Sequence, residues 1–121
     1  MPFYKIKSPF IFTIFGASGD LAKLKIFPAL YELMESGRMP EDFCIVGFAR
    51  SAKERRAFQD EFRESVKSKI KHVNPATLKK LVEHVYYFTG QYTEIESYRK
   101  YSQFLKRLSN GRKWMKMNYF A

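Results

Sequence analysis

The sequence predicts an α/β fold built on a parallel β-sheet, and three observations support this prediction. Short apolar runs alternate with longer segments whose apolar residues recur every third or fourth position. The order strand, helix, strand, helix, strand, helix is typical of parallel strands joined by crossover helices. The 121 residues are 45% hydrophobic and 28% charged, which is the composition of one globular domain and excludes bulk disorder.

The first strand and helix are expected near the N-terminus. Residues 10–15, Phe-Ile-Phe-Thr-Ile-Phe, form an apolar run that ends at Gly16, which predicts a strand buried on both faces. An amphipathic helix is expected over residues 20–36, where apolar residues follow a helical period. Because Pro28 removes a backbone donor within this helix, the helix should kink or divide near Phe27.

The second strand is expected at residues 43–49, which form another apolar run. A charged helix then spans 51–71, with Ser51 as its N-cap and Glu54 completing a capping box. The apolar residues of this helix recur every fourth position and are Phe58, Phe62, Val66 and Ile70.

A shorter helix, a third strand and a last helix complete the predicted pattern. The helix covers 75–83, and the strand covers 84–89 and is closed by Gly90. The last helix begins at Ile95 and ends near Asn110-Gly111.

A glycine-containing turn joins the first strand to the first helix. Gly16, Gly19 and Ala22 form a G-x-x-G-x-x-A variant of the dinucleotide-binding fingerprint. The first glycine allows the tight turn, the second lets the backbone approach a pyrophosphate, and the alanine permits close contact between helix and strand. The helix N-terminus adds unpaired amides and a partial positive charge. These features predict a Rossmann-type parallel sheet, the first β-α-β-α-β half of a doubly wound domain; glycines that only form a turn are the alternative.

The end of the second strand indicates which dinucleotide binds. Folds that bind NAD usually place Asp or Glu there, whereas folds that bind NADP place an arginine near the 2′-phosphate. Here Arg50 and Ser51 follow Ala49, and a guanidinium beside a hydroxyl suits a phosphate monoester. We therefore expect NADP as the cofactor, with a solvated arginine at a strand end as the alternative.

Basic residues are concentrated towards the C-terminus. The formal net charge is +10, and no acidic residue follows Glu96. Residues 97–121 contain seven basic and no acidic residues, so they carry seven of the ten net charges, and the rest of the chain is nearly balanced in charge. At the end of this region, residues 112–121 form a basic tail with neither caps nor a clear period. A basic protein that interacts with nucleic acid is therefore an alternative function, but we do not favour it because the charge excess is confined to one end.

The remaining candidate groups argue against other kinds of chemistry. Cys44 alone cannot form an intrachain disulfide or a cysteine-rich metal site, so we expect no metal and a reducing, cytoplasmic location. We also expect no membrane span, because charged residues interrupt every apolar run. His72 and His84 are expected to be solvated or capping residues.

The stretches around these motifs resemble the glucose-6-phosphate dehydrogenase family. The first stretch is Phe-Gly-Ala-Ser-Gly-Asp-Leu-Ala-Lys-Leu-Lys at residues 15–25, followed by Pro-Ala-Leu-Tyr at 28–31. Residues 40–43, 45–51 and 87–92 are also similar to the N-terminal coenzyme domain of that family, in the same order. The resemblance runs from about residue 10 to residue 110.

The resemblance implies roles for individual residues. It implies that Lys25 lies at the catalytic site beside the sugar phosphate, although on the sequence alone Lys25 is an exposed helix residue. Asp20 is ambiguous, because an acid in the first turn stabilises any helix. The cofactor-binding residues implied by the resemblance are Gly16, Ala17, Ser18, Gly19, Asp20 and Leu21 for the pyrophosphate, and Arg50 and Ser51 for the 2′-phosphate.

The resemblance also implies the function of a complete enzyme. The family oxidises glucose 6-phosphate to 6-phosphogluconolactone and transfers hydride to NADP in the oxidative pentose phosphate pathway, and its full-length members are homo-oligomers. Its general-base histidine and sugar-phosphate pocket belong to a second domain, which we expect to lie outside this chain. We therefore expect the chain alone to be inactive, and a non-catalytic NADP-binding fragment is the alternative.

The expected boundary of the coenzyme domain lies near residue 111. Residues 1–111 should form an incomplete dinucleotide-binding domain, followed by the basic tail at 112–121, which does not resemble the family. Because a shift of one base restores a family-like sequence, we hypothesise a frameshift near Arg112. Without later strands, one edge of the first strand should stay unpaired, and the fragment should self-associate.

Overall fold

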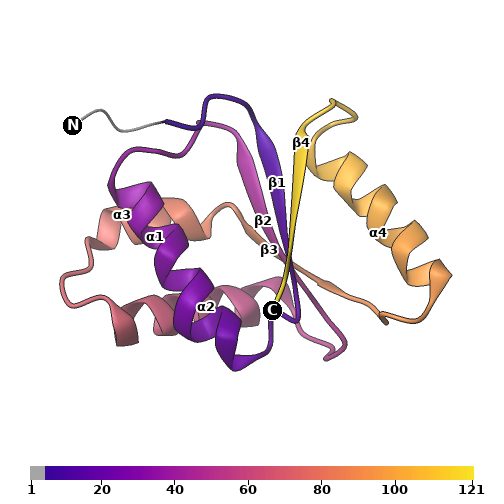
Figure 1. Cartoon of the computed structure of the whole chain (residues 1–121), viewed down its shortest axis with the longest axis horizontal. Helices are drawn as coiled ribbons and strands as arrows, with labels where there is room; N and C mark the ends of the chain where they lie inside the picture. The colour runs from indigo at the N-terminus through magenta and orange to yellow at the C-terminus, as the bar shows by residue number, and fades with distance from the viewer. Residues whose placement is uncertain (1–4) are drawn as a thin grey trace.

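The computed structural model describes residues 5–121 as a parallel sheet with helices on both faces (Figure 1). The strands are β1 (Phe10–Phe15), β2 (Phe43–Ala49), β3 (Val85–Thr89) and β4 (Met115–Phe120), in the spatial order β3-β2-β1-β4. All neighbouring strands pair in parallel. The predicted Rossmann-type α/β fold is confirmed, and the three predicted strands match β1, β2 and β3.

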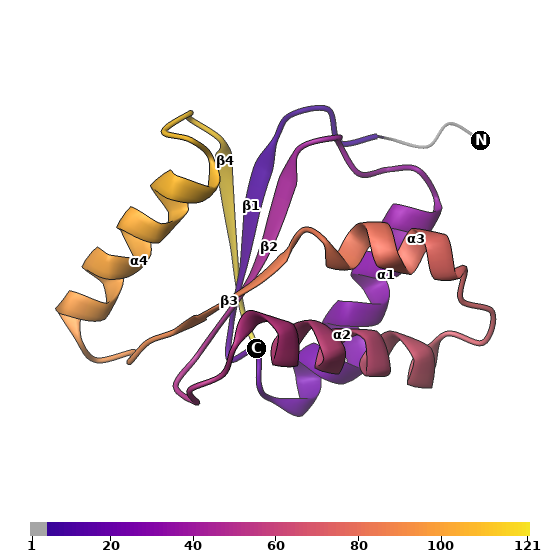
Figure 2. The ribbon, with the colours of Figure 1, turned by 180° about the vertical axis from the view of Figure 1, so that it is seen from behind.

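Helices cover the two faces of the sheet unequally. One face carries the short π-helix η1 (Ala22–Ile26), α1 (Phe27–Glu35), α2 (Arg55–Lys69) and α3 (Pro75–Val82), while α4 (Ile95–Leu108) lies on the other (Figure 2). Right-handed crossover connections require this division, because β2 and β3 extend to one side of β1 and β4 to the other. Within residues 5–121, no helix has the length and apolar character that a membrane span needs.

The first predicted helix changes its hydrogen-bonding pattern just before its proline. π-Helical hydrogen bonding ends at Ile26, and the amide of Phe27 donates to the carbonyl of Ala22. Pro28 lies in the first turn of α1, where its missing N–H breaks no α-helical bond. The helix does not divide near Phe27, because Ile26 and Phe27 both keep right-handed helical φ and ψ angles, and only the hydrogen bonding changes there from π-helical to α-helical.

The predicted capping box at the start of α2 is wrong. This helix begins at Arg55, and its N-cap Glu54 makes no side-chain capping bond. Ser51 lies before the helix, and its carbonyl accepts a hydrogen bond from the Tyr87 hydroxyl at 2.6 Å. Because that bond holds the chain against β3, a contact distant in sequence overrides the local helix signal.

Two polar residues have structural roles that the sequence pattern did not predict. The side-chain oxygen of Asn74 accepts hydrogen bonds from the amides of Ala76 at 3.0 Å and Thr77 at 3.3 Å, and so caps α3. His84, expected to be solvated or capping, is half-buried and stacks on Phe43 with ring centroids 4.0 Å apart. Its ring nitrogen Nδ1 also donates to the Phe43 carbonyl at 2.8 Å, which links the starts of β2 and β3.

Aromatic side chains form the core beneath α1, α2 and α3. Phe27 stacks on Phe62 with ring centroids 4.7 Å apart, and its ring meets Phe58 edge-on at 5.6 Å. Gly47 on β2 gives the Phe58 ring room to lie on the sheet, since a Cβ there would be 2.4 Å from that ring. This close packing brings α2 against the sheet just behind the ends of β1 and β2.

The other face has its own buried cluster, which holds α4. Tyr101 packs against Phe48 and Phe88, with ring centroids 5.1 Å and 5.0 Å away. Its hydroxyl forms a buried hydrogen bond with Thr13 of β1. The polar partner is needed because an unpaired hydroxyl at this depth would cost about 1–3 kcal/mol.

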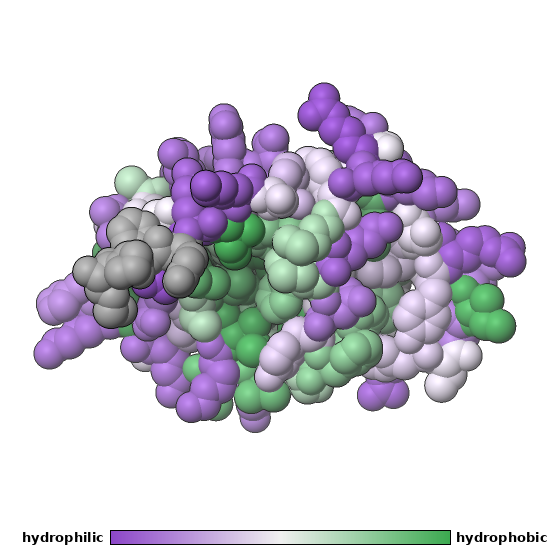
Figure 3. Space-filling model, turned by 45° about the horizontal axis from the view of Figure 1, so that its top comes forward, coloured by the Kyte–Doolittle hydropathy of each residue, from purple (hydrophilic) through white to green (hydrophobic). Residues whose placement is uncertain are grey.

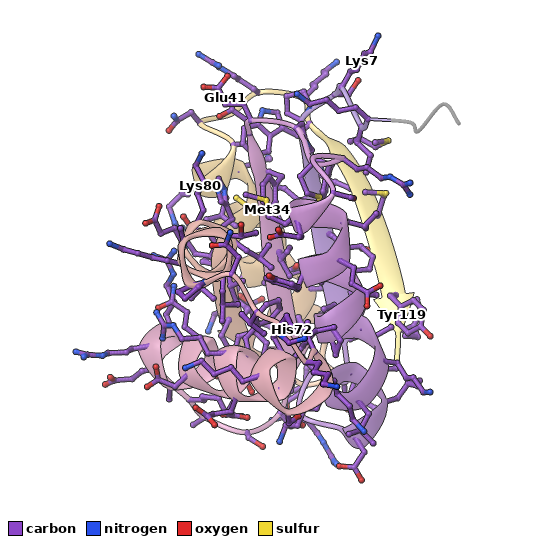
Figure 4. All side chains as sticks on the ribbon, turned by 90° about the vertical axis from the view of Figure 1, so that its left-hand side faces the viewer. Lys7, Met34, Glu41, His72, Lys80 and Tyr119 are labelled. Atoms are coloured by element: carbon purple, nitrogen blue, oxygen red, sulfur yellow. The ribbon has the colours of Figure 1, made fainter. Side chains whose placement is uncertain are left out.

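The C-terminal segment supplies a strand that the sequence did not reveal. β4 pairs with β1 from Phe10 opposite Met115 to Phe15 opposite Phe120. The expectation that the first strand keeps an unpaired edge is therefore wrong. Side chains of β4 are mostly exposed, so its sequence carries no burial pattern, and Tyr119 projects at the outer edge of the molecule (Figure 4).

The outer edge of the sheet borders an apolar groove. Met117 of β4 contributes to it, together with residues of β1, α1 and the neighbouring loops. Figure 3 shows hydrophobic residues gathered in the middle of one face and framed by hydrophilic side chains. The groove has a volume of about 190 Å³ and is lined by Ile6, Phe10, Phe12, Leu30, Leu33, Met39 and Met117.

Candidate dinucleotide site

A cavity of about 370 Å³ opens at the carboxyl edge of the sheet. Ligands of open parallel sheets bind at this edge, beside the strand from which the connections diverge to opposite faces. That strand is β1 here, and the C-terminus marks the same edge in Figure 1. Segments that follow all four strands line the cavity through Phe15, Gly16, Ser18, Gly19, Ala49, Arg50, Ser51, Tyr92, Phe120 and Ala121.

The turn after β1 needs a glycine at its first position. Gly16 has a φ of 83°, in the left-handed region that residues with a Cβ rarely adopt. A Cβ there would also lie 3.0 Å from the carbonyl oxygen of Ala121. The amides of Gly16 and Ala17 both donate to the Phe48 carbonyl, at 2.9 Å and 3.4 Å, so the turn is tied to β2.

The second half of the turn faces the cavity. The Gly19 amide closes the turn by donating to the Gly16 carbonyl at 3.0 Å. Apart from that carbonyl oxygen and its chain neighbours, a Cβ on Gly19 would meet no heavy atom within 4 Å. Among the residues that the structure describes, the Ser18 amide has no hydrogen-bond partner. The start of the next helix adds unpaired amides. The turn therefore offers donors and open space to an anion.

The structure separates the other predicted residues of the turn from the cavity lining. Ala17 is fully buried beneath the turn. Asp20 lies in a different groove between η1 and α2, and Leu21 is 44% exposed outside the cavity. Lys25 is an exposed residue of η1 and does not line the cavity. Of the turn residues, the cavity brings together Gly16, Ser18 and Gly19.

A cation without a protein partner lies on the opposite wall. Arg50 follows β2 and is exposed, and within residues 5–121 its guanidinium makes no hydrogen bond, ion pair or ring contact. Ser51 is exposed beside it. Among the side chains that line the cavity, Arg50 carries the only charge, and that charge favours an anionic ligand.

Two aromatic residues complete the walls, and the sequence argument assigned neither of them a role. Tyr92 follows β3, donates its hydroxyl to the Phe48 carbonyl at 3.3 Å and remains 38% exposed. Phe120 stacks on Phe15 with ring centroids 4.8 Å apart and is 75% exposed. A signal for Tyr92 was present, since the end of the third parallel strand must reach the edge where Gly16 and Arg50 lie.

The groups with shifted pKa values lie outside the cavity lining. Burial raises the pKa of Cys44 to about 11, and burial also raises the pKa of Tyr101. The pKa of Tyr87 is raised by burial and by the nearby Glu61 carboxylate. No cluster of His, Cys, Asp or Glu in the described chain has a metal-binding arrangement.

Comparisons with known proteins agree on one family. A family model described as glucose-6-phosphate dehydrogenase, NAD binding domain, matches residues 13–121. The glucose-6-phosphate 1-dehydrogenase of Chlamydia muridarum is 33% identical over 93% of this chain, and the chloroplastic one of Nicotiana tabacum is 37% identical over 89%. A solved structure of glucose-6-phosphate dehydrogenase in complex with glucose-6-phosphate has a TM-score of 0.84 and 27% identity over the whole chain.

The chain spans a quarter or less of the length of these proteins. It covers 23% of the Chlamydia muridarum enzyme, 18% of the Nicotiana tabacum enzyme and 25% of the chain in the solved structure. The family match continues to residue 121 and so includes β4. This similarity extends past the residues from about 10 to 110 that carried the resemblance in the sequence.

Proposed function

Because the chain belongs to the glucose-6-phosphate dehydrogenase family, we propose that it is the coenzyme-binding part of such an enzyme and holds NADP in the cavity at the carboxyl edge of the sheet. One observation carries this proposal above the others. Within residues 5–121, the cavity lining has a glycine turn whose Ser18 amide is free and, on the segment after β2, the guanidinium of Arg50, which has no partner. These are the groups needed by a ligand with a diphosphate and a separate phosphomonoester.

The glycine turn binds the pyrophosphate in this proposal. Gly16 gives the chain its left-handed bend, and Gly19 leaves the cavity side open for close approach. Ser18 contributes its amide, while Asp20 and Leu21 begin the helix whose first turn presents its remaining amides. Ala17 supports the turn and does not touch the ligand, because its side chain is buried under the turn and its amide donates to β2.

Arg50 and Ser51 select NADP over NAD in this proposal. NADP carries a 2′-phosphate where NAD carries a hydroxyl, and a guanidinium can donate two parallel hydrogen bonds to such a phosphate. Arg50 need not break an ion pair with a described residue in order to do so. Tyr92, on the third wall, offers a partly exposed ring against which an adenine base can stack.

The complete enzyme would then oxidise glucose 6-phosphate. In this reaction the anomeric carbon of the sugar gives a hydride to the nicotinamide of NADP, and the hydroxyl on that carbon gives a proton to a base. The product is 6-phosphogluconolactone. Lys25 is proposed as the residue of this chain at the catalytic site beside the sugar phosphate. The described cavity has no general base, so we propose that the chain alone binds the coenzyme without turnover.

An affinity measurement with a matched control tests the coenzyme assignment. Calorimetric titration of the chain should show tighter binding of NADP than of NAD. The Arg50→Ala variant should bind NADP about tenfold to a hundredfold more weakly and so lose that preference. Arg56→Ala is the control, because Arg56 is an exposed arginine on α2 that does not line the cavity. Equal affinities for NADP and NAD in the unaltered chain would contradict the assignment.

We also propose a location and an assembly state. The single cysteine, Cys44, is buried and unpaired, which suits a reducing, cytoplasmic environment. The exposed edge of β4 favours self-association of the chain, and the resemblance implies that full-length members of the family are homo-oligomers.

A further inference from the structure

The chain between β2 and α2 has neither helical nor strand structure, yet it carries the cation of the cavity. Residues 50–54 make this connection, and Arg50 is the first of them. Such a segment is mobile unless other groups hold it. Two separate interactions hold it, and the residues that provide them from outside the segment, Tyr87 and Glu61, do not line the cavity.

The first interaction fixes the backbone next to Arg50. The Tyr87 hydroxyl donates to the Ser51 carbonyl at 2.6 Å, and the Thr89 hydroxyl approaches the same oxygen at 3.4 Å. Tyr87 is only 8% exposed, and its ring packs on Phe58 with centroids 5.0 Å apart. Because β3 and the core fix the ring, the position of the Ser51 carbonyl is also fixed.

The second interaction fixes the side chain of Lys53. Its ammonium lies 2.9 Å from the Glu61 carboxylate on α2 and 5.3 Å from the centroid of the Tyr87 ring. Glu61 also pairs with Lys23, in η1, at 3.5 Å. One carboxylate thus links the segment after β2 to the helix that follows the glycine turn.

We propose that Tyr87 and Glu61 are positioning residues for nucleotide selection, which hold the segment after β2 so that Arg50 stays at the cavity wall. Neither residue lines the cavity. The inference rests on the proposed function, because it assigns to these residues the preorganisation of the 2′-phosphate contact.

The physical basis is the cost of ordering a loop on binding. If residues 50–54 were free, each NADP molecule would have to order them before Arg50 could reach its phosphate, and this cost would reduce the affinity. NAD has no 2′-phosphate and would not use that contact. Loss of a tether should therefore weaken NADP binding and leave NAD binding unchanged.

The buried hydroxyl is suited to this role at neutral pH. Burial and the Glu61 carboxylate raise the pKa of Tyr87 above its ordinary value, so the hydroxyl keeps its proton and remains a donor to the Ser51 carbonyl. A phenylalanine at this position would keep the ring contacts and remove only the donor.

Tyr87→Phe tests the proposal against Tyr86→Phe, a control on the same strand. The control ring packs against Phe104 of α4 and lies beside the guanidinium of Arg55, the first residue of α2. By titration calorimetry with NADP and NAD, Tyr87→Phe should lower the NADP affinity by about threefold to tenfold and leave the NAD affinity unchanged. A merely structural role would weaken both nucleotides alike. The control should retain the preference of the unaltered chain.

Three results overturn the proposal, and they are distinguishable. If the unaltered chain prefers NADP and a folded Tyr87→Phe variant keeps the full preference, this inference fails alone. If the unaltered chain binds both nucleotides equally, the proposed function fails with it. If Tyr87→Phe does not fold, Glu61→Gln decides, because that half-exposed site tolerates the change. Removing the negative charge of Glu61 would by itself favour the binding of anions. A loss of NADP preference in this variant therefore reports lost positioning of Arg50, and an unchanged preference overturns the inference.

Discussion

At Gly16 the chain leaves β1 with a φ of 83°, and the carbonyl oxygen of Ala121 would lie 3.0 Å from an added Cβ. Gly16→Ala therefore combines backbone strain with a contact at 3.0 Å. We expect it to lower the free energy of unfolding by about 1–3 kcal/mol, and to weaken NADP binding, because the turn must shift. Urea unfolding monitored by circular dichroism measures the first effect, and calorimetry the second.

Gly37→Ala is a matched control for Gly16→Ala. Gly37 also has a positive φ, of 73°, but a Cβ there would meet nothing within 4 Å. It should therefore lose about 1 kcal/mol of stability from strain alone and keep its coenzyme affinity. If both variants bind NADP as the unaltered chain does, the glycine turn does not hold the pyrophosphate.

The buried thiol of Cys44 predicts a dependence of stability on alkaline pH. Burial raises its pKa from 9.0 to about 11, so the unfolded chain releases the proton at lower pH than the native one. The stabilisation is fully present below pH 9 and is lost as the pH rises towards 11, by at most about 1.4 kcal/mol per pH unit.

Urea titrations at several pH values measure this dependence. Cys44→Ala is the comparison, because all other titrating groups are common to both chains. The difference in unfolding free energy between the two chains should shrink as the pH rises. A constant difference between pH 8.5 and 11 would show that the thiol does not titrate differently in the two states.

At the scale of single elements, the ends of helices α2 and α3 differ in how they are held. Asn74 accepts two amide hydrogen bonds at the start of α3, whereas Ser51 makes no capping bond to α2. Asn74→Ala should therefore cost about 1 kcal/mol of stability, and Ser51→Ala should change it by less than about 0.5 kcal/mol.

Thermal and urea unfolding without coenzyme compare the two variants directly. The absence of coenzyme matters, because Ser51 is also proposed to bind the 2′-phosphate. A larger loss for Ser51→Ala than for Asn74→Ala would restore the capping box that the sequence predicted at residue 51.

For the whole molecule, the exposed edge of β4 governs solubility and assembly. The amides of Met115 and Ala121 donate towards β1, so the alternation along a parallel strand turns the even-numbered amides outward. A second copy can pair with this free edge, which borders an apolar groove. We expect concentration-dependent self-association of the chain, measured by light scattering coupled to size exclusion.

Asn118→Pro should reduce this association. It removes an outward amide and leaves the bonds from β4 to β1 in place, as proline is tolerated in edge strands. Asn118→Ala keeps the amide and is the control, which should associate as the unaltered chain does. A monodisperse monomer at all concentrations would contradict the expected association.

The domain boundary near residue 111 and the frameshift near Arg112 stay predictions. Residues 115–120 form β4, and the family match includes them, so any change of frame would alter side chains on an edge strand that tolerates exposure. Resequencing the gene tests the frameshift, and an uninterrupted ancestral frame would contradict it.

Local chemistry was sufficient for the strand and helix order, the bend at Gly16 and the position of Arg50. Each depends on a residue and its immediate neighbours: an apolar run, a permissive φ, or the first residue after a strand. The parallel topology then places the strand ends at one edge, so Gly16 and Arg50 are brought to the same cavity.

Only the folded chain decided that Met115–Phe120 is a strand, that α2 begins at Arg55, and that Tyr92 walls the cavity. An edge strand is held by backbone bonds to a partner about a hundred residues away, which leave little pattern in its own side chains. The Tyr87 hydroxyl similarly donates a hydrogen bond to the Ser51 carbonyl, 36 residues earlier in the sequence. Such pairings depend on distance in space, and neighbouring residues in the sequence do not encode them.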